Sequence, residues 1–286
     1  MSSQKSVALL EVLQGGAGFL NKHHVEQPRL NVEHLLAHVL GIPRLELYLQ
    51  FDRLLEEKEL APLRELLHKR SKGIPLQHLL GTVDFCGRIF LCDTRALIPR
   101  PETEQFVERA LAHHGCEHIL DVGTGSGIIA ITIALERKHA HVEAIDLSLE
   151  ALELAQENAR RHEASNITWH HGNLLEPLAK KESTTPFDLI VANLPYIPRE
   201  EIPTLTREIS YDPIMALDGG TDGLDLIKRL IQDAVTQLKP GGYLLLEIGK
   251  NQENEVMNCL KQHGYDDILA LHDYQGVLRF VEAVRR

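Results

Sequence analysis

The residues with the clearest chemical potential are Asn193, Leu194, Pro195 and Tyr196, which directly follow a short apolar run at residues 187–192. Such a run is typical of a strand buried on both faces of a parallel sheet. Open α/β sheets bind ligands at the carboxyl ends of their strands, so an amide, a rigid proline and an aromatic ring in this place favour a site for a small planar polar group. The alternative is an ordinary turn, because Asn and Pro are common turn residues. We call residues 193–196 the amide motif.

A second candidate is the glycine loop, residues 123–127, which follows an expected strand at residues 118–122 and precedes an apolar helix. Glycines let the backbone approach a ligand closely and leave helix amides available to it. A dinucleotide fingerprint would need its third glycine at the position of Ile128, which disfavours nicotinamide binding. The pattern Asp-Val-Gly-x-Gly-x-Gly instead resembles the cofactor loop of class I S-adenosylmethionine methyltransferases. That resemblance implies cofactor contacts from Gly123, Thr124, Gly125, Ser126 and Gly127.

Two more expected strands end in polar residues. The strand at residues 141–146 ends in Asp146, where a carboxylate could accept hydrogen bonds from both ribose hydroxyls. Ser148 is then a predicted N-cap. The strand at residues 167–170 leads to Asn173 and Leu174, which the resemblance places beside the adenine. The methyltransferases often have Asp in place of Asn173, and the amide oxygen of Asn can accept the same hydrogen bond.

The order of these motifs on successive strands resembles amino methyltransferases with an Asn-Pro-Pro-Tyr signature, a set that includes DNA adenine-N6 and protein glutamine-N5 enzymes. Segments outside the amide motif distinguish the two. Residues 73–77, 98–104, 216–220, 222–224 and 246–249 resemble HemK-type peptide chain release factor glutamine methyltransferases. The similarity covers nearly the whole chain, and one position departs from the signature, since Leu194 replaces its second residue, proline.

Adenine and glutamine both present a planar NH2 group whose lone pair is delocalised. The resemblance implies that the side-chain oxygen of Asn193 and the main-chain carbonyl of Leu194 accept its two N–H bonds, and that Asn193 also borders the cofactor. Leucine can replace proline here because the acceptor is a backbone atom. Pro195 keeps part of the stiffness, and Tyr196 can pack against the flat amide. Displacement at a sulfonium methyl needs positioning and exclusion of water, so no metal is expected.

Arg100 lies between Pro99 and Pro101 in a stiff segment, and Pro101 suits the first position of a helix. Arg100 could orient the substrate or a cofactor carboxylate, or it could brace the loop. Both alternatives stay open. Adjacent histidines, such as His170 and His171, seldom point at one ligand, and there is no C-x-x-C or H-E-x-x-H spacing, so the sequence predicts no metal site and reduced cysteines.

Composition narrows the class of protein. The 286 residues are 43% hydrophobic and 25% charged, as is typical of a soluble globular protein, with a net charge of −11. An acidic chain lacks the positive field that attracts phosphate backbones, which disfavours a nucleic-acid substrate. No apolar run approaches the ~20 residues that span a bilayer, and no signal-peptide pattern is present, which predicts a cytoplasmic protein.

The periodicity predicts three parts: a helical domain at residues 1–80, a β-hairpin linker at 81–97 and an α/β domain at 98–286. The resemblance implies that the first is a substrate-recognition domain and the last an S-adenosylmethionine-dependent methyltransferase domain. Helices are expected from residue 4, with Asn31 as the N-cap of a helix that ends at Gly41. The expected fold class is α/β, a doubly wound seven-stranded sheet whose final strands form an antiparallel pair. The resemblance implies that this is the class I methyltransferase sheet.

The resemblance implies that the protein transfers a methyl group from S-adenosylmethionine, with S-adenosylhomocysteine as product. The acceptor would be the side-chain amide nitrogen (N5) of the glutamine in the Gly-Gly-Gln motif of class 1 peptide chain release factors, its protein partners. Three alternatives remain: an adenine-N6 nucleic-acid methyltransferase, a glutamine methyltransferase for another protein, and a cofactor-binding regulator without turnover. Only the basic cluster at residues 69–72 supports the first of these.

Overall fold

The computed structural model describes residues 6–179 and 185–286, which group into two compact units. The helical unit contains the described residues up to Thr82 together with Thr206–Tyr211, and the catalytic unit contains Val83–Leu205 and Asp212–Arg286. Residues 1–5 of the predicted helical domain lie outside the described residues. Within the described ranges, no helix is long and apolar enough to cross a membrane.

The helical unit is built from amphipathic helices around one apolar core. Its elements are α1 (Leu9–Lys22), α2 (Pro28–Leu40), η1 (Arg44–Leu49), α3 (Glu57–Ser71) and α4 (Leu76–Leu80), with β1 (Val7–Ala8) paired to β2 (Leu54–Leu55). Side chains at helical spacing form the core, among them Leu9, Leu13, Val32, Leu35, Leu36 and Leu63. The predicted end of α2 is confirmed, because Gly41 caps it in the left-handed conformation with φ +64°.

The predicted N-cap of α2 is wrong. The helix begins at Pro28, whose fixed φ suits a first helical position, so Asn31 lies inside the first turn and is buried. Its Nδ2 donates to the carbonyls of Glu26 and Gln27, at 3.0 and 3.1 Å. The Asn31 side chain therefore fixes the chain that enters the helix instead of capping a free N–H group.

Arg70 of α3 joins three parts of the helical unit. Its side chain is buried and donates from Nε to Asn31 Oδ1 (2.6 Å), from Nη1 to the Ile74 carbonyl (3.2 Å) and from Nη2 to Glu208 Oε1 (2.5 Å). Glu208 belongs to Thr206–Tyr211, a segment from the second half of the chain. Arg70 therefore ties this segment to the helices by a charge-assisted bond.

We predict that Arg70→Met lowers the free energy of unfolding of the helical unit by about 1–3 kcal/mol, because the buried oxygen of Asn31 loses its donor. Lys69→Met, also in α3, is the matched control. Lys69 pairs with Glu65, and their side chains are 46% and 67% exposed, so water replaces the lost contact and the effect should be smaller. Urea unfolding followed by circular dichroism measures both variants, and equal losses would contradict the assignment.

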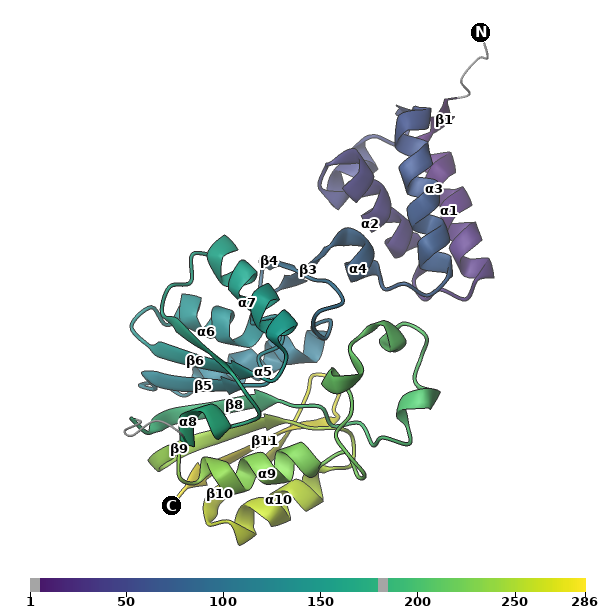
Figure 1. The fold of residues 1–286 in the computed structure, drawn as a ribbon. Coiled ribbons are helices and arrows are strands. Elements are labelled where there is room, and N and C mark those ends of the chain that lie inside the picture. The colour runs from purple at the N-terminus through teal and green to yellow at the C-terminus, as the bar shows by residue number, and fades with distance from the viewer. Residues whose placement is uncertain (1–5, 180–184) are drawn as a thin grey trace. The chain divides into compact units, whose positions relative to one another are not determined.

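The catalytic unit is organised around a sheet of seven strands within the described residues (Figure 1). The strands β9 (Leu238–Glu247), β8 (Phe187–Asn193), β5 (His118–Val122), β6 (His141–Asp146) and β7 (Ile167–His171) run parallel in this order. The strand β11 (Leu278–Arg285) pairs antiparallel with β9, and β10 (Tyr265–His272) pairs antiparallel with β11 at the edge. The predicted doubly wound sheet with a final antiparallel pair is confirmed.

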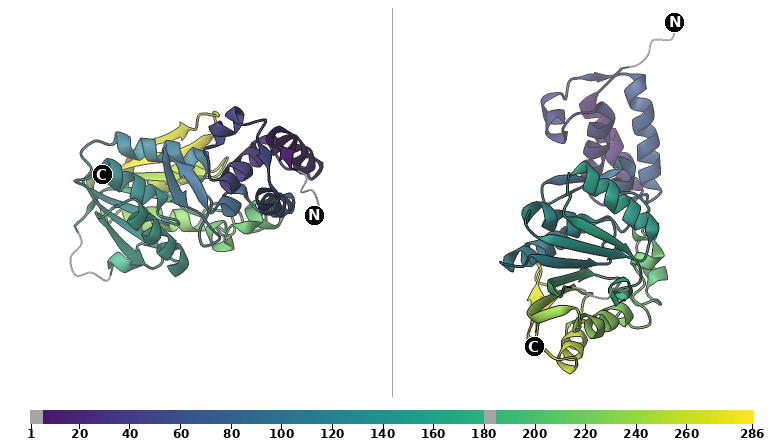
Figure 2. Two further views of the ribbon diagram at one scale, coloured as in Figure 1. Left: turned by 90° about the horizontal axis from the view of Figure 1, so that it is seen from above. Right: turned by 60° about the vertical axis from the view of Figure 1, so that its left-hand side comes forward.

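Helices cover both faces of the sheet (Figures 1 and 2). One face packs against α5 (Pro101–Ala112), α6 (Ile128–Glu136) and α7 (Leu149–Arg161). The other face packs against α8 (Glu176–Ala179), α9 (Asp225–Ala234) and α10 (Glu253–Gln262). The central strands are buried on both sides, which explains why they read as continuous apolar runs and not as alternating patterns.

The sequence predicts the hairpin after the helical unit correctly, but it misplaces the boundary between α9 and β9. The hairpin of β3 (Thr82–Phe85) and β4 (Arg88–Leu91) turns at Cys86 and Gly87, both at positive φ, as a two-residue hairpin turn requires. The sequence pattern also predicts a helix to Leu238, a turn at residues 239–242 and a strand from Tyr243, and these limits are wrong. In the structure α9 ends at Ala234 and β9 begins at Leu238. The Lys-Pro-Gly-Gly segment lies inside β9 because the pairing with β8 shifts its register between Phe187 and Leu189.

Candidate active site

A pocket lies at the carboxyl ends of the parallel strands. The strands β5 and β8 are neighbours, and the chain runs from β5 to one side through β6 and β7 before it returns to β8 on the other side. Such a switch point is where open α/β sheets bind ligands. The predicted residues that line the pocket are Gly123, Thr124, Gly125, Ser126, Asp146, Asn173, Leu174, Asn193, Leu194 and Pro195. The structure thus brings the glycine loop and most of the amide motif together.

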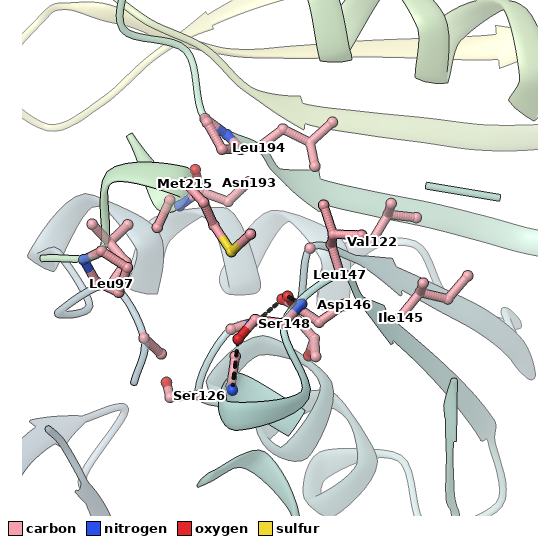
Figure 3. Close-up of a pocket in the computed structure, with 18 of the residues that line it drawn as sticks. Leu97, Val122, Ser126, Ile145, Asp146, Leu147, Ser148, Asn193, Leu194 and Met215 are labelled. Carbon is pink, nitrogen blue, oxygen red and sulfur yellow. Dashed lines mark hydrogen bonds between the residues drawn. The ribbon is translucent and has the colours of Figure 1, made fainter. Parts of the chain in front are cut away.

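Gly127, Tyr196 and Arg100 are absent from the described pocket lining. Conversely, sequence reasoning did not single out several lining residues, including Ala96, Leu97, Thr103 and Met215. Figure 3 shows Leu97 and Met215 opposite Asp146 and Ser148. Their apolar side chains carry no reactive group, so nothing in their residue types marked them as part of a site.

The glycine loop needs its glycines for two reasons. Gly123, Gly125 and Gly127 all have positive φ, at +75°, +54° and +78°. A Cβ atom on Gly123 would lie 2.9 Å from Cδ2 of Leu194, and one on Gly127 would lie 2.8 Å from Cβ of Ala155. Substitution is therefore strained by conformation and by crowding, which explains how the loop packs closely against the amide motif and α7.

We predict that Gly127→Ala is more destabilising than Gly115→Ala. Both positions have positive φ, which costs an L-residue about 1–2 kcal/mol, but a Cβ on Gly115 meets no atom within 4 Å. The additional crowding against Ala155 should lower the free energy of unfolding by a further ~1–3 kcal/mol. Thermal unfolding of the two variants measures the difference, and similar melting temperatures would show that the crowding is relieved at little cost.

Two aspartates hold the glycine loop. The buried Asp121 accepts hydrogen bonds at Oδ2 from Thr124 Oγ1 (2.6 Å) and from the Ala130 amide (3.2 Å), while its Oδ1 has no partner among the described residues. Burial raises the pKa of Asp121 to about 7. Asp146 accepts from the Gly125 amide at Oδ2 and from the Ser148 amide at Oδ1, both at 2.8 Å. Burial also raises the pKa of Asp146, and the backbone hydrogen bonds oppose that shift.

Helix α7 begins at Leu149, three residues after Asp146. Ser148 is its N-cap, and the Ser148 hydroxyl oxygen accepts from the Ala151 amide, as predicted. The hydrogen bonds of Asp146 and Ser148 are visible in Figure 3. The end of β6 and the start of α7 therefore form one hydrogen-bonded corner of the pocket.

The side chain of Asn193 lies at the end of β8, opposite Glu247 at the end of β9 in the register of the sheet. Asn193 Nδ2 donates to Thr103 Oγ1 (3.4 Å), and the Thr103 hydroxyl donates to Glu247 Oε2 (3.1 Å). Thr103 and Glu247 are both buried. Burial raises the pKa of Glu247 to about 7. The amide of Asn193 is thus tied to a buried carboxyl group through one hydroxyl.

The other residues of the amide motif are held by packing in the apolar core and by contacts to their backbone. The Leu194 side chain is 4% exposed and packs in the apolar core. The Tyr196 carbonyl accepts from Gln252 Nε2 (2.9 Å), and a Cβ on Gly223 would lie 2.3 Å from this same carbonyl oxygen. Burial raises the pKa of the Tyr196 hydroxyl to about 12. The glycine-rich segment before α9 therefore packs directly on the backbone of the motif.

Arg100 is not among the described residues that line the pocket, and its side chain contacts Asp212. Its Nη2 donates to Asp212 Oδ2 (2.8 Å), and the other oxygen of this buried carboxylate accepts from the Ile98 amide (3.1 Å). Asp212 thereby fixes the segment that leads into α5. These contacts favour the bracing role of Arg100 over the orientation of a substrate or cofactor.

A group of potential metal ligands lies elsewhere. Among the described residues, one group of three brings ligand atoms within 4.8 Å of one another: His118, His141 and Glu143. His118 Nε2 and His170 Nε2 lie 3.0 and 2.5 Å from the two oxygens of Glu143. The group is at the amino ends of β5 and β6, whereas the pocket is at their carboxyl ends. It is therefore separate from the candidate active site.

Comparison with known proteins gives the family. Residues 11–81 match the model of the PrmC N-terminal domain, and residues 113–272 match that of a methyltransferase domain. The chain is 42% identical over 274 residues to a release factor glutamine methyltransferase of Geobacter sulfurreducens, which covers 95% of this chain and 94% of the relative. It is 39% identical over 289 residues to the release factor glutamine methyltransferase of Chlorobaculum tepidum, which covers 98% of each chain.

A likeness to solved structures concerns the fold alone. A methyltransferase from Pyrococcus furiosus superposes with a TM-score of 0.52 at 18% sequence identity, over 68% of this chain and 88% of that chain. It supports the class I methyltransferase architecture of the sheet, and the long matches to curated relatives are more specific. The chain therefore belongs to the release factor glutamine methyltransferase family.

Proposed function

We propose that this protein transfers a methyl group from S-adenosylmethionine to the side-chain amide nitrogen of the glutamine in the Gly-Gly-Gln motif of class 1 release factors. The observation that carries the proposal is that Asn193 and Leu194 line the same pocket as the glycine loop and Asp146. An acceptor for a planar NH2 group therefore adjoins a cradle for a nucleoside cofactor. Membership of the family supports the choice of glutamine over adenine.

The residues of the pocket fit S-adenosylmethionine. A backbone without Cβ atoms at Gly123 and Gly125 allows close approach, and Asp146 has acceptor capacity left for ribose hydroxyls, because a carboxylate oxygen accepts more than one hydrogen bond. Asn173 and Leu174 would contact the adenine. When bound, the cofactor supplies a methyl group on a cationic sulfonium.

The amide motif would bind and orient the glutamine. Asn193 Oδ1 and the Leu194 carbonyl, which receives no hydrogen bond from the described residues, would accept the two N–H bonds of the substrate amide. Pro195 restricts the backbone between them and the aromatic ring of Tyr196. Both acceptors stabilise the positive charge that develops on the nitrogen as it attacks. The apolar lining from Leu97, Val122 and Met215 would exclude water.

We assign the helical unit to recognition of the release factor, with the domain limits expected from the sequence. All described residues that line the pocket belong to the catalytic unit, which leaves the helical unit without a part in the chemistry. The helical unit also exposes apolar side chains, Leu45 at 71% and Leu49 at 85%. Both leucines lie in the short helix η1, and we assign them to the docking surface because contiguous exposed apolar patches mark interaction sites.

Methyl transfer from labelled S-adenosylmethionine tests the proposal. The enzyme is incubated with a recombinant class 1 release factor, with the same factor carrying Ala in place of the motif glutamine, and with DNA and RNA. We expect label on the unaltered factor alone. Label on nucleic acid but not on the factor would refute the proposal in favour of an adenine methyltransferase, and binding of the cofactor without any transfer would favour a regulator.

A further inference from the structure

We propose that Glu247 and Thr103 are positioning residues that hold the Asn193 amide with its oxygen toward the pocket. The inference rests on the proposed methylation of an amide nitrogen and extends it to two residues that act through the Asn193 side chain. Thr103 lies in the first turn of α5, and Glu247 ends the strand next to β8. Both side chains are almost inaccessible to water, at 3% and 2% exposed.

The argument begins with the shape of an amide. The oxygen and nitrogen of an Asn side chain are nearly equal in size, so packing alone does not decide which of them faces a ligand. Hydrogen bonding decides it here. The Thr103 hydroxyl donates its only proton to Glu247 Oε2, so it can only accept a hydrogen bond from Asn193. An ionised Glu247 can likewise only accept, and the amide NH2 must therefore face Thr103 and Glu247.

The consequence concerns the substrate. With the NH2 group turned to Thr103, the Asn193 oxygen is left for the pocket, where it can accept from the glutamine NH2. The opposite orientation would set two NH2 groups against each other, and no hydrogen bond would form. A buried carboxylate behind the amide also polarises it, which makes its oxygen a stronger acceptor while positive charge develops on the attacking nitrogen.

The charge on Glu247 depends on its surroundings. Burial raises its pKa to about 7, and Glu102 of α5 acts in the same direction. The Thr103 hydroxyl, the Asn193 amide and the Arg279 guanidinium of β11 oppose the shift. The ionised form therefore becomes dominant as the pH rises through about 7, and a protonated carboxyl could donate a proton and release the amide from its required orientation.

Kinetics of matched variants test the proposal. Glu247→Gln keeps the size but adds a donor, and Thr103→Val keeps the shape but removes the hydroxyl. We expect both to lower kcat at least tenfold with the Kd for S-adenosylmethionine changed less than about twofold, since the lost contribution acts on the transition state. Thr103→Ser should recover most of kcat. Thr132→Val, which removes a buried hydroxyl from α6, should leave kcat unchanged.

The pH dependence separates positioning from mere packing. For the wild type, kcat should rise as the pH passes about 7, the pKa of Glu247, and this rise should be absent from Glu247→Gln. Unchanged kcat in Glu247→Gln, an unchanged pH profile, or a loss of cofactor binding equal to the loss of kcat would each overturn the proposal. Failure of Thr103→Ser to recover kcat would also contradict it.

A structural readout keeps the inference distinguishable from the proposed function. The side-chain 15N–1H resonances of Asn193 should shift with pH through about 7 in the wild type and should not shift in Glu247→Gln. If the wild type fails to label a release factor but the Asn193 resonances shift with pH in this way, the proposed function is wrong and the positioning role of Glu247 and Thr103 stands. If the factor is labelled and the resonances are insensitive to pH and to the variant, the positioning is wrong.

Discussion

Asn193→Ala should lower kcat by about 10²- to 10³-fold while the Kd for S-adenosylmethionine changes less than about threefold. The Asn193 side chain lines the pocket and its NH2 group is engaged by Thr103, so its oxygen is the side-chain acceptor offered to the substrate amide. Truncation removes a contact that strengthens as the nitrogen gains charge. Single-turnover kinetics with saturating cofactor measure the loss, and calorimetry measures cofactor affinity.

A second asparagine of the pocket provides the control. Asn173 also lines the pocket, and it is assigned to the adenine. We therefore expect Asn173→Ala to weaken cofactor binding and to leave kcat near the wild-type value once the cofactor is saturating. Wild-type turnover by Asn193→Ala would remove it from the catalytic role, and the same pattern in both variants would show that neither residue is specific to the acceptor.

Asp146→Ala should have the opposite signature, with cofactor binding weakened about 100-fold and kcat at saturation much less affected. Two hydrogen bonds from ribose hydroxyls to a carboxylate would be lost, each with a contribution of about 1.5–3 kcal/mol, and part of that loss is recovered by water. The carboxylate also holds the amides of Gly125 and Ser148, so its removal loosens the glycine loop itself.

Asp146→Asn separates the two contributions. Its amide oxygen can still accept from a backbone N–H, whereas its NH2 group cannot accept from a hydroxyl. We expect intermediate affinity, measured by calorimetry of the cofactor or of S-adenosylhomocysteine. Full affinity in Asp146→Ala would contradict the assignment of the ribose, and a lower kcat with unchanged affinity would place Asp146 at the methyl acceptor.

The chemistry at the strand ends is predictable from the sequence. The apolar runs that lead to Gly123, Asp146 and Asn193 mark central strands, and the residue after each run is polar or is glycine. Parallel strands place these carboxyl ends at one edge of the sheet, which brings together groups up to 70 residues apart in the chain. That reasoning gives the fold and most of the pocket without any knowledge of side-chain contacts.

Contacts between side chains on distant elements were not predictable. Thr103 and Glu247 are 144 residues apart, and nothing in their local patterns indicates that a carboxyl group is buried at this position. The same holds for Arg70 and Glu208, which are 138 residues apart and place Thr206–Tyr211 with the helical unit. Asn31 shows the limit of local rules, because the preference of proline for the first position moved the helix start.

The central claim is that this pocket methylates the amide nitrogen of the release-factor glutamine. Mass spectrometry of the Gly-Gly-Gln peptide, after incubation of the release factor with S-adenosylmethionine and either the wild type or Asn193→Ala, tests it most directly. The wild type is predicted to add the mass of one methyl group, located by fragmentation to the glutamine side chain, and Asn193→Ala to add almost none at equal times. A methyl group on another residue, or equal modification by both enzymes, would contradict the claim.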